Sequence, residues 1–135
     1  MGRILALDMG EVRVGIAITD ESNLIALPHK TIFLKDLIKN LKDICEKEEI
    51  EKIVIGLPRN MDGTIGSQAK EIERIAKEIE NNLNLSIEFF DETATSLKAE
   101  KRLRKRKIDP RARKELVDLE SAVIILEDYL KEHAK

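Results

Sequence analysis

The first third of the chain has short apolar runs separated by polar turns. These runs predict strands at Arg3 to Met9 and Arg13 to Thr19, and a third strand within Leu24 to Phe33 that Pro28 interrupts or limits to a sheet edge. The first link is short enough for a hairpin, and the second has the composition of a turn. An antiparallel meander is therefore expected here.

The apolar spacing then changes to that of helices. Helical stripes run from 37 to 45, from 72 to 83 and from 116 to 130, and they alternate with strands predicted at Lys52 to Leu57 and Ser86 to Phe90. Ser67 is expected to cap the second of these helices, and Asp109-Pro110 to end a basic helix before the last one. This order predicts an α/β fold with a mixed five-stranded sheet, flanked by helices on both faces, in a single domain over residues 1–135.

Acidic residues end two of the predicted strands. Asp8 directly follows an apolar run, and Asp91-Glu92 closes the last strand. A lone carboxylate at the end of a buried strand is costly unless something uses its charge. We expect the first, fourth and fifth strands to be parallel, so their carboxyl ends share one edge of the sheet and these acids lie together.

A third acid is predicted to reach this edge from the last helix. Asp118 lies near the expected start of that helix, and the small residues Ser121 and Ala122 would let the helix approach the sheet closely. Clustered carboxylates repel one another unless a divalent cation holds them. Three oxygen donors with open positions suit Mg²⁺ or Mn²⁺, and such ions can activate water for phosphodiester cleavage.

Each acid also has a purely structural interpretation. Asp8 could form a turn with the glycine that follows it closely, and Asp118 could be a solvated first-turn acid favoured by the helix dipole. Asp91 could cap the following helix, which leaves Glu92 as the better ligand.

Two further residues are candidates for substrate contacts. Arg13 could bind a scissile phosphate, or it could form a structural ion pair with Asp91 or Asp20. The polar loop from Arg59 to Gly66, which includes Asn60, could contact nucleic acid or be an ordinary surface loop.

Charge is distributed unevenly along the chain. The net charge is only −2, but Lys98 to Lys114 contains ten basic residues and two acids. A concentrated basic segment on an acidic body suggests a polyanionic partner, so we expect nucleic acid. The segment has no aromatic residue, which favours contacts to the phosphate backbone over base stacking, although a solvated helix face would look similar. The candidate contacts are Lys101, Arg102, Arg104, Lys105 and Arg106.

Other features narrow the class of protein. A single cysteine, Cys45, excludes an intrachain disulfide, and no apolar stretch approaches the roughly 20 residues of a membrane-spanning helix. The start of the chain lacks the order of a signal peptide. We expect a soluble cytoplasmic domain without a membrane partner, and the sequence leaves the oligomeric state open.

Four motifs occur together in one order: Asp8-x-Gly10-x-x-Arg13-x-Gly15, Gly56-Leu57-Pro58-x-Asn60-x-Asp62-Gly63, Asp91-Glu92-x-x-Thr95 and Asp118-x-x-Ser121-Ala122-x-x-Ile125-Leu126. In these motifs, over essentially its whole length, the chain resembles the YqgF family, also called RuvX. The resemblance implies a ribonuclease H-like fold and a nuclease that processes the 5′ end of precursor 16S ribosomal RNA, with Holliday-junction resolution as an older proposal for the family. It also implies that Asp8, Glu92 and Asp118 are the catalytic, metal-binding acids.

The chain departs from the family pattern at two points. Thr93 stands where the family usually has arginine, and Ser121-Ala122 where it often has two alanines. Neither change removes a carboxylate, but the missing arginine could weaken a phosphate contact. Three functions stay open: a metal-dependent endonuclease acting on structured RNA or branched DNA, a non-catalytic nucleic-acid-binding module, and one lobe of a sugar-kinase or actin-like ATPase.

Overall fold

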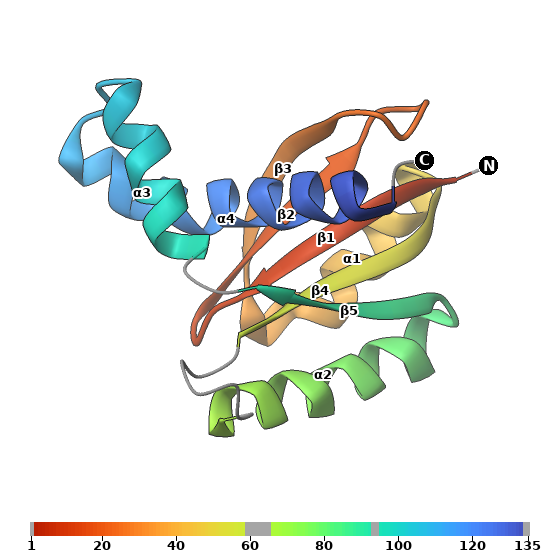
Figure 1. Cartoon of the computed structure of the whole chain (residues 1–135). Coiled ribbons are helices and arrows are strands. Elements are labelled where there is room, and N and C mark those ends of the chain that lie inside the picture. The colour runs from red at the N-terminus through yellow and green to blue at the C-terminus, as the bar shows by residue number, and fades with distance from the viewer. Residues whose placement is uncertain (1, 59–65, 93–94, 134–135) are drawn as a thin grey trace.

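The computed structural model describes residues 2–58, 66–92 and 95–133 (Figure 1). Its strands are β1 (Arg3–Met9), β2 (Arg13–Thr19), β3 (Ala26–Phe33), β4 (Ile50–Pro58) and β5 (Ser86–Glu92). Its helices are the 3₁₀ turn η1 (Leu34–Asp36) and the α-helices α1 (Leu37–Lys47), α2 (Ser67–Leu83), α3 (Thr95–Lys105) and α4 (Pro110–His133).

The five strands form one mixed sheet in the order β3-β2-β1-β4-β5. The pairs β1–β2 and β2–β3 are antiparallel, whereas β1–β4 and β4–β5 are parallel. This confirms the predicted meander and the predicted parallel strands. The carboxyl ends of β1, β4 and β5 therefore lie at the same edge of the sheet.

The third strand is an edge strand, which explains how it accommodates a proline. Pro28 lies opposite Ala17, and the register shifts between Ile16 and Ala17. The missing N–H of proline costs little at an edge, where one side of the strand has no partner. The strand begins at Ala26, slightly later than the apolar run suggested.

Two helix starts differ from the prediction. Gly66 is the N-cap of α2, and Ser67 is the first helical residue and makes no side-chain capping bond. The last helix begins at Pro110, because proline is favoured in the first turn of a helix, where its missing N–H needs no partner. Asp118 therefore lies two turns into α4, and its interpretation as a first-turn acid is wrong.

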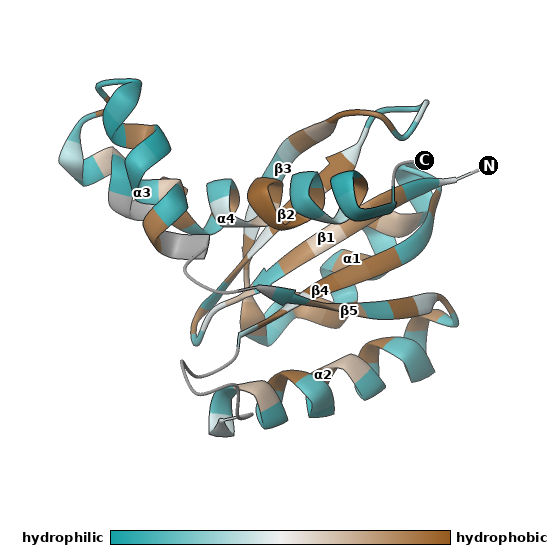
Figure 2. Cartoon of the chain, in the orientation of Figure 1, coloured by the Kyte–Doolittle hydropathy of each residue, from teal (hydrophilic) through white to brown (hydrophobic). Residues whose placement is uncertain are grey.

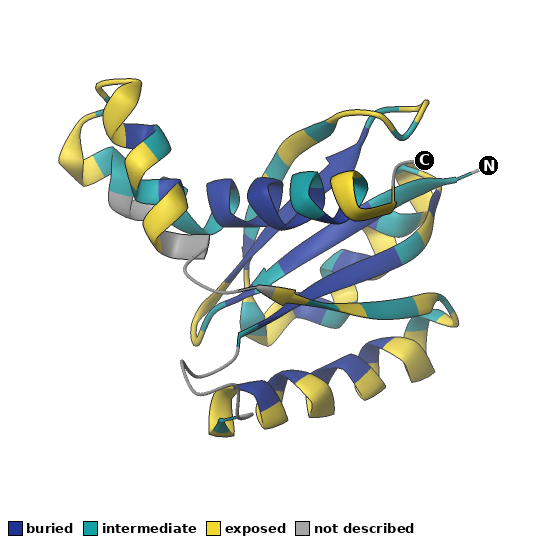
Figure 3. Ribbon diagram, viewed as in Figure 1, coloured by how far each residue is buried: buried dark blue, intermediate teal, exposed yellow. Residues whose placement is uncertain are grey.

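Helices cover both faces of the sheet, as predicted. Large aliphatic side chains on one face pack against α1 and α2, while α4 crosses the other face over smaller residues (Figures 1 and 3). The hydrophobic positions follow this layering, and α3 packs on α4 with a mostly hydrophilic surface (Figure 2). In the described ranges, no helix is long and apolar enough to cross a membrane.

Candidate functional site

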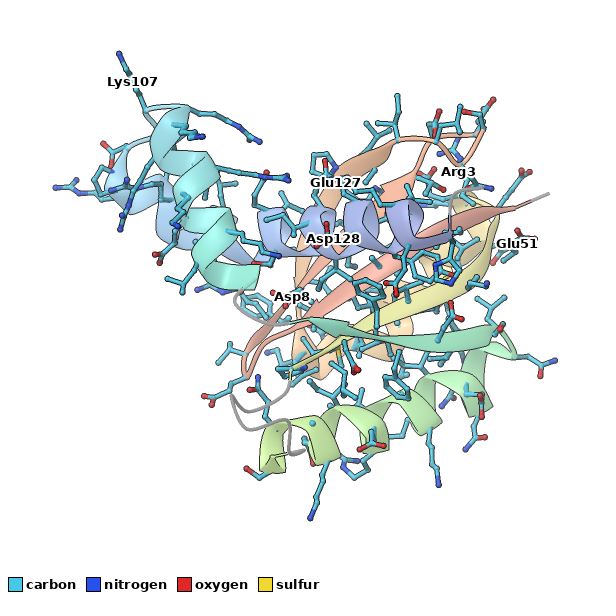
Figure 4. All side chains as sticks on the ribbon, viewed as in Figure 1. Arg3, Asp8, Glu51, Lys107, Glu127 and Asp128 are labelled. Carbon is cyan, nitrogen blue, oxygen red and sulfur yellow. The ribbon has the colours of Figure 1, made fainter. Side chains whose placement is uncertain are left out.

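Asp8 and Asp118 come together at the edge where the parallel strands end. Along β1, Leu7 and Met9 point into the core beneath α1 and α2, so Asp8 faces α4 (Figure 4). Gly15 lies opposite Asp8 on β2, and a Cβ atom built on it would stand 2.0 Å from the backbone oxygen of Asp118. The backbone of α4 therefore contacts the sheet beside Asp8.

The electrostatics of this pair fit a cation site. Burial, and to a smaller extent the charge of the nearby Asp118 carboxylate, raises the pKa of Asp8 to about 7. Burial also raises the pKa of Asp118, while the Arg13 guanidinium acts to lower it. Two partly desolvated carboxylates supply the hard oxygen donors that Mg²⁺ and Mn²⁺ prefer, and such a cation would relieve their repulsion.

The structural interpretation of Asp8 as a turn residue finds no support. The link between β1 and β2 is closed by a backbone hydrogen bond in which Gly10 N donates to Arg13 O over 2.9 Å. The Asp8 carboxylate makes no hydrogen bond with another described residue. Within the described residues, the hairpin is therefore closed by backbone groups and not by the Asp8 side chain.

The other predicted acids lie partly outside the described residues. Glu92 is the last residue of β5 and its backbone pairs with Pro58, but its side chain is not described. Asp91, its exposed neighbour, belongs to the face of the sheet opposite to that of Asp8. No set of three metal-ligating side chains occurs within the described part of the chain, where Asp8 and Asp118 form a pair. Asn60 and Thr93 fall outside the described ranges.

Arg13 lies at the start of β2 with its side chain exposed, and its charge acts on Asp118. The alternative ion pair with Asp20 is wrong, because Asp20 follows the far end of β2. Its Oδ1 atom instead accepts hydrogen bonds from Leu24 N (2.8 Å) and Ile25 N (2.9 Å). Arg13 thus stays at the edge that carries the two acids.

The basic segment divides into a paired and an unpaired set. Arg102 Nη2 lies 2.7 Å from Glu127 Oε1, and Arg106 Nη2 lies 2.8 Å from Oε1 of the buried Glu120, so these arginines bind α3 to α4. Lys101 and Lys105 are exposed and form no ion pair with the described residues. The sequence pattern made these positions look equivalent, because it does not show which of them face α4.

One arginine at the site was not predicted from the sequence. Arg113 and Arg104 line a groove of about 320 Å³ that also includes Asp118, and Arg104 interacts only weakly with Glu100 at 3.9 Å. Arg113 precedes Asp118 by five residues on α4. Placing the start of the helix at Pro110 would have assigned Arg113 to the same helix as the acid.

A larger hollow of about 810 Å³ lies at the opposite end of the α4 face. Lys52, Tyr129 and His133 line it, together with Leu24 and Ile25 from the link before β3. It is at the amino ends of β1 and β4, and it includes neither Asp8 nor Asp118. The carboxylate chemistry is therefore separate from this hollow.

Known proteins share both the sequence and the fold. A protein of Thermosynechococcus vestitus named "Putative pre-16S rRNA nuclease" is 38% identical over 130 residues, covering 94% of this chain and 86% of the relative. One of Crocosphaera subtropica with the same name is 42% identical over 93% of this chain and 90% of its own length. Thermus thermophilus RuvC, solved with a Holliday junction substrate, has the same fold, with a TM-score of 0.58 and 11% identity over 98% of this chain and 96% of its own.

The family comparison covers nearly the whole chain. The model described as "RuvX: Holliday junction resolvase" matches residues 2–132, a range that includes Asp8, Glu92 and Asp118. It agrees with the motif resemblance and with the mixed sheet. The chain therefore belongs to the RuvX family.

Proposed function

We propose that this nuclease is a metal-dependent endonuclease that cleaves phosphodiester bonds in structured RNA, and that its substrate is the 5′ end of precursor 16S ribosomal RNA. The observation that carries the proposal is the convergence of Asp8 and Asp118. The names of its relatives support the choice of RNA. The family description supports branched DNA as a second candidate substrate.

The donor set fits Mg²⁺ or Mn²⁺. Asp8 and Asp118 would hold the ion, together with Glu92, whose backbone ends β5 opposite Pro58. When bound, the ion would supply a Lewis acid and an activated water. Without an ion, part of the Asp8 population carries a proton at neutral pH, because burial raises the pKa of Asp8 to about 7.

The surrounding residues would bind and orient the substrate. Arg13 would contact a phosphate, since an exposed guanidinium forms charge-assisted hydrogen bonds with phosphate oxygens. Lys101 and Lys105 would contact the backbone farther from the cleaved bond, with Arg104 beside them. Arg102 and Arg106 contribute less, because acids on α4 already neutralise them.

The test uses Asp8→Asn, which keeps the size of the side chain but removes its charge. Labelled precursor 16S RNA and a four-way DNA junction would be incubated with Mg²⁺, Mn²⁺ or EDTA. We expect the variant to lose cleavage by on the order of 10³-fold or more while binding persists. Asp43→Asn is the matched control, because Asp43 is exposed on α1 and pairs with Lys47.

Each outcome bears on one candidate. Cleavage by pure Asp8→Asn at the wild-type rate would contradict the proposed site. If the wild-type protein binds but does not cleave with Mg²⁺, Mn²⁺ or EDTA, the result would instead support a non-catalytic nucleic-acid-binding module. The relative rates on RNA and on the junction choose between the two substrates. Membership of the RuvX family disfavours the ATPase lobe, and a binding assay with ATP would test it directly.

Salt dependence tests the exposed lysines of α3. Reversing both charges in Lys101→Glu/Lys105→Glu should weaken binding. It should also flatten the plot of log affinity against log salt, by about 0.7–0.9 for each phosphate that the variant no longer neutralises. Lys39→Glu/Lys42→Glu reverses two exposed charges on α1 and is the matched control. An unchanged slope in the first variant would mean that α3 presents an ordinary solvated face.

A further inference from the structure

A second hollow lies beside the two acids, toward the β3 edge of the sheet. It has a volume of about 300 Å³ and is lined by Arg13, Thr31, Ile32, Phe33 and Leu116. Thr31 pairs with Gly15, and Gly15 pairs with Asp8. Because neighbouring strands are about 4.8 Å apart, Thr31 lies about 10 Å from Asp8 across the sheet.

The aromatic ring in this hollow is exposed to solvent. Phe33 ends β3 with 54% of its surface accessible, and it pairs in register with Arg13, so both side chains belong to the face that carries Asp8. Lys35 Nζ lies 5.7 Å from the centre of the Phe33 ring. An apolar ring with one cation near its centre and a second cation lining the same hollow, next to a site for phosphodiester cleavage, matches the chemistry of an unpaired nucleotide.

The other phenylalanines have different surroundings. Phe90 is partly buried and packs edge-on against Tyr129, with 6.0 Å between ring centres. Phe89 is 40% exposed, but it alternates with Phe90 and so belongs to the opposite face of β5. Among the hollows described here, the one that Arg13 lines is also lined by Phe33.

We propose that Phe33 stacks on an unpaired base of the bound strand, next to the cleaved bond, while Arg13 binds the phosphate of that nucleotide. This inference rests on the proposed function. It restricts the substrate class to strands that are unpaired beside the cleavage point. It also adds base stacking to a protein whose basic segment has no aromatic residue.

Affinity measurements in the Asp8→Asn background test the stacking without cleavage. The probe is a labelled oligonucleotide with an unpaired segment, made as RNA and as DNA. We expect Phe33→Ala to weaken binding about 5- to 100-fold, and Phe33→Tyr to retain it, because stacking needs the ring. Phe89→Ala is the matched control and should bind as tightly as its parent. With an abasic segment in the probe, Phe33→Ala and its parent should bind equally.

A spectroscopic experiment is independent of activity. The chain contains no tryptophan, so the emission of Phe33→Trp reports this position alone. We expect the unpaired oligonucleotide to quench this emission, and a fully paired duplex to leave it unchanged. Phe89→Trp should not respond to either probe.

Two results would overturn the inference: equal affinity of Phe33→Ala and its parent for the probe with bases, or no quenching of Phe33→Trp at saturating oligonucleotide. Both can occur while Asp8→Asn still abolishes cleavage, so the stacking can fail without the nuclease mechanism. Conversely, quenching with unchanged cleavage in Asp8→Asn would keep the stacking site and reject the proposed catalytic acids.

Discussion

The two faces of the sheet are built differently. The face beneath α1 and α2 presents large aliphatic side chains, among them Leu7 and Ile55, which are fully buried. The face beneath α4 presents Ala6, Ala17 and Gly15, so the helix backbone reaches the strands. Bulky side chains keep a helix away from a sheet and stabilise the packing. Small residues bring α4 close enough to place Asp118 beside Asp8. One face therefore mainly stabilises the fold, and the other holds the two acids next to each other.

Gly15→Ala should disrupt the packing of α4 on the sheet and have the largest effect. The new Cβ would lie 2.0 Å from the Asp118 backbone oxygen and 3.0 Å from Leu119 N, so the helix must move. We expect the free energy of unfolding to fall by about 5 kcal/mol or more, and cleavage by the folded fraction to fall by at least about 10²-fold. Denaturant unfolding and single-turnover cleavage measure the two effects.

Gly56→Ala is the control for this substitution, because it also adds a methyl group under α4. The added Cβ would meet the tip of a side chain, Ile125 Cδ1, at 2.4 Å, and that tip can rotate away. A smaller loss of stability and near-normal cleavage are expected. Equal losses at the two glycines would show that contact with the α4 backbone is not what positions Asp118.

Leu41→Ala should have the opposite profile, since it acts on the face that provides stability. Leu41 lies on α1, is completely buried and packs in the larger core cluster. Its removal leaves a cavity and should cost about 2–5 kcal/mol of unfolding free energy. The cleavage rate per folded molecule should stay at the wild-type value, measured well below the unfolding midpoint. A rate that falls with stability would mean that the faces are not independent.

The difference between the faces also explains what the sequence could predict. The first two strands match their predicted bounds, because short apolar runs bounded by turn residues are local signals. The sequence also predicted that Asp118 approaches Asp8, from the small residues Ser121 and Ala122, which are buried. It could not separate Arg102, paired with α4, from Lys101, which is exposed and forms no ion pair within the described ranges, because that depends on how two helices pack. The position of Phe33 beside the acids likewise depends on the register of β3.

Asp8→Asn should reveal how much the buried carboxylate of Asp8 lowers the stability of the protein. Burial raises the pKa of Asp8 from 3.8 to about 7, so the folded state binds this proton more tightly than the unfolded state. The contribution of Asp8 to the stability of the metal-free protein is therefore greatest below about pH 4 and falls as the pH rises toward 7. The variant has no carboxyl group to ionise at this position, so above pH 7 it should be more stable than wild type by up to about 4 kcal/mol.

Unfolding curves in EDTA at pH 4.5 and pH 8 measure this difference. Added Mg²⁺ should stabilise wild type more at pH 8, where the carboxylates are ionised, and should have little effect on the variant. Parallel stability curves of wild type and variant across this pH range would contradict the burial and repulsion inferred for Asp8.

Tyr129→Phe should have the smallest effect, and it tests whether the whole α4 face is functional or only the end with the acids. At the opposite end of this face, Lys52 Nζ donates a 3.1 Å hydrogen bond to the Tyr129 hydroxyl. The variant loses this bond but keeps a ring to pack against Phe90 and His133. Because Lys52 is partly exposed, water can replace the missing partner, and the cost should be about 0.5–1.5 kcal/mol. Cleavage should be unchanged, since Tyr129 is on the last part of α4, three turns beyond Asp118. If the cleavage rate per folded molecule falls in this variant, the functional region instead extends along the entire helix.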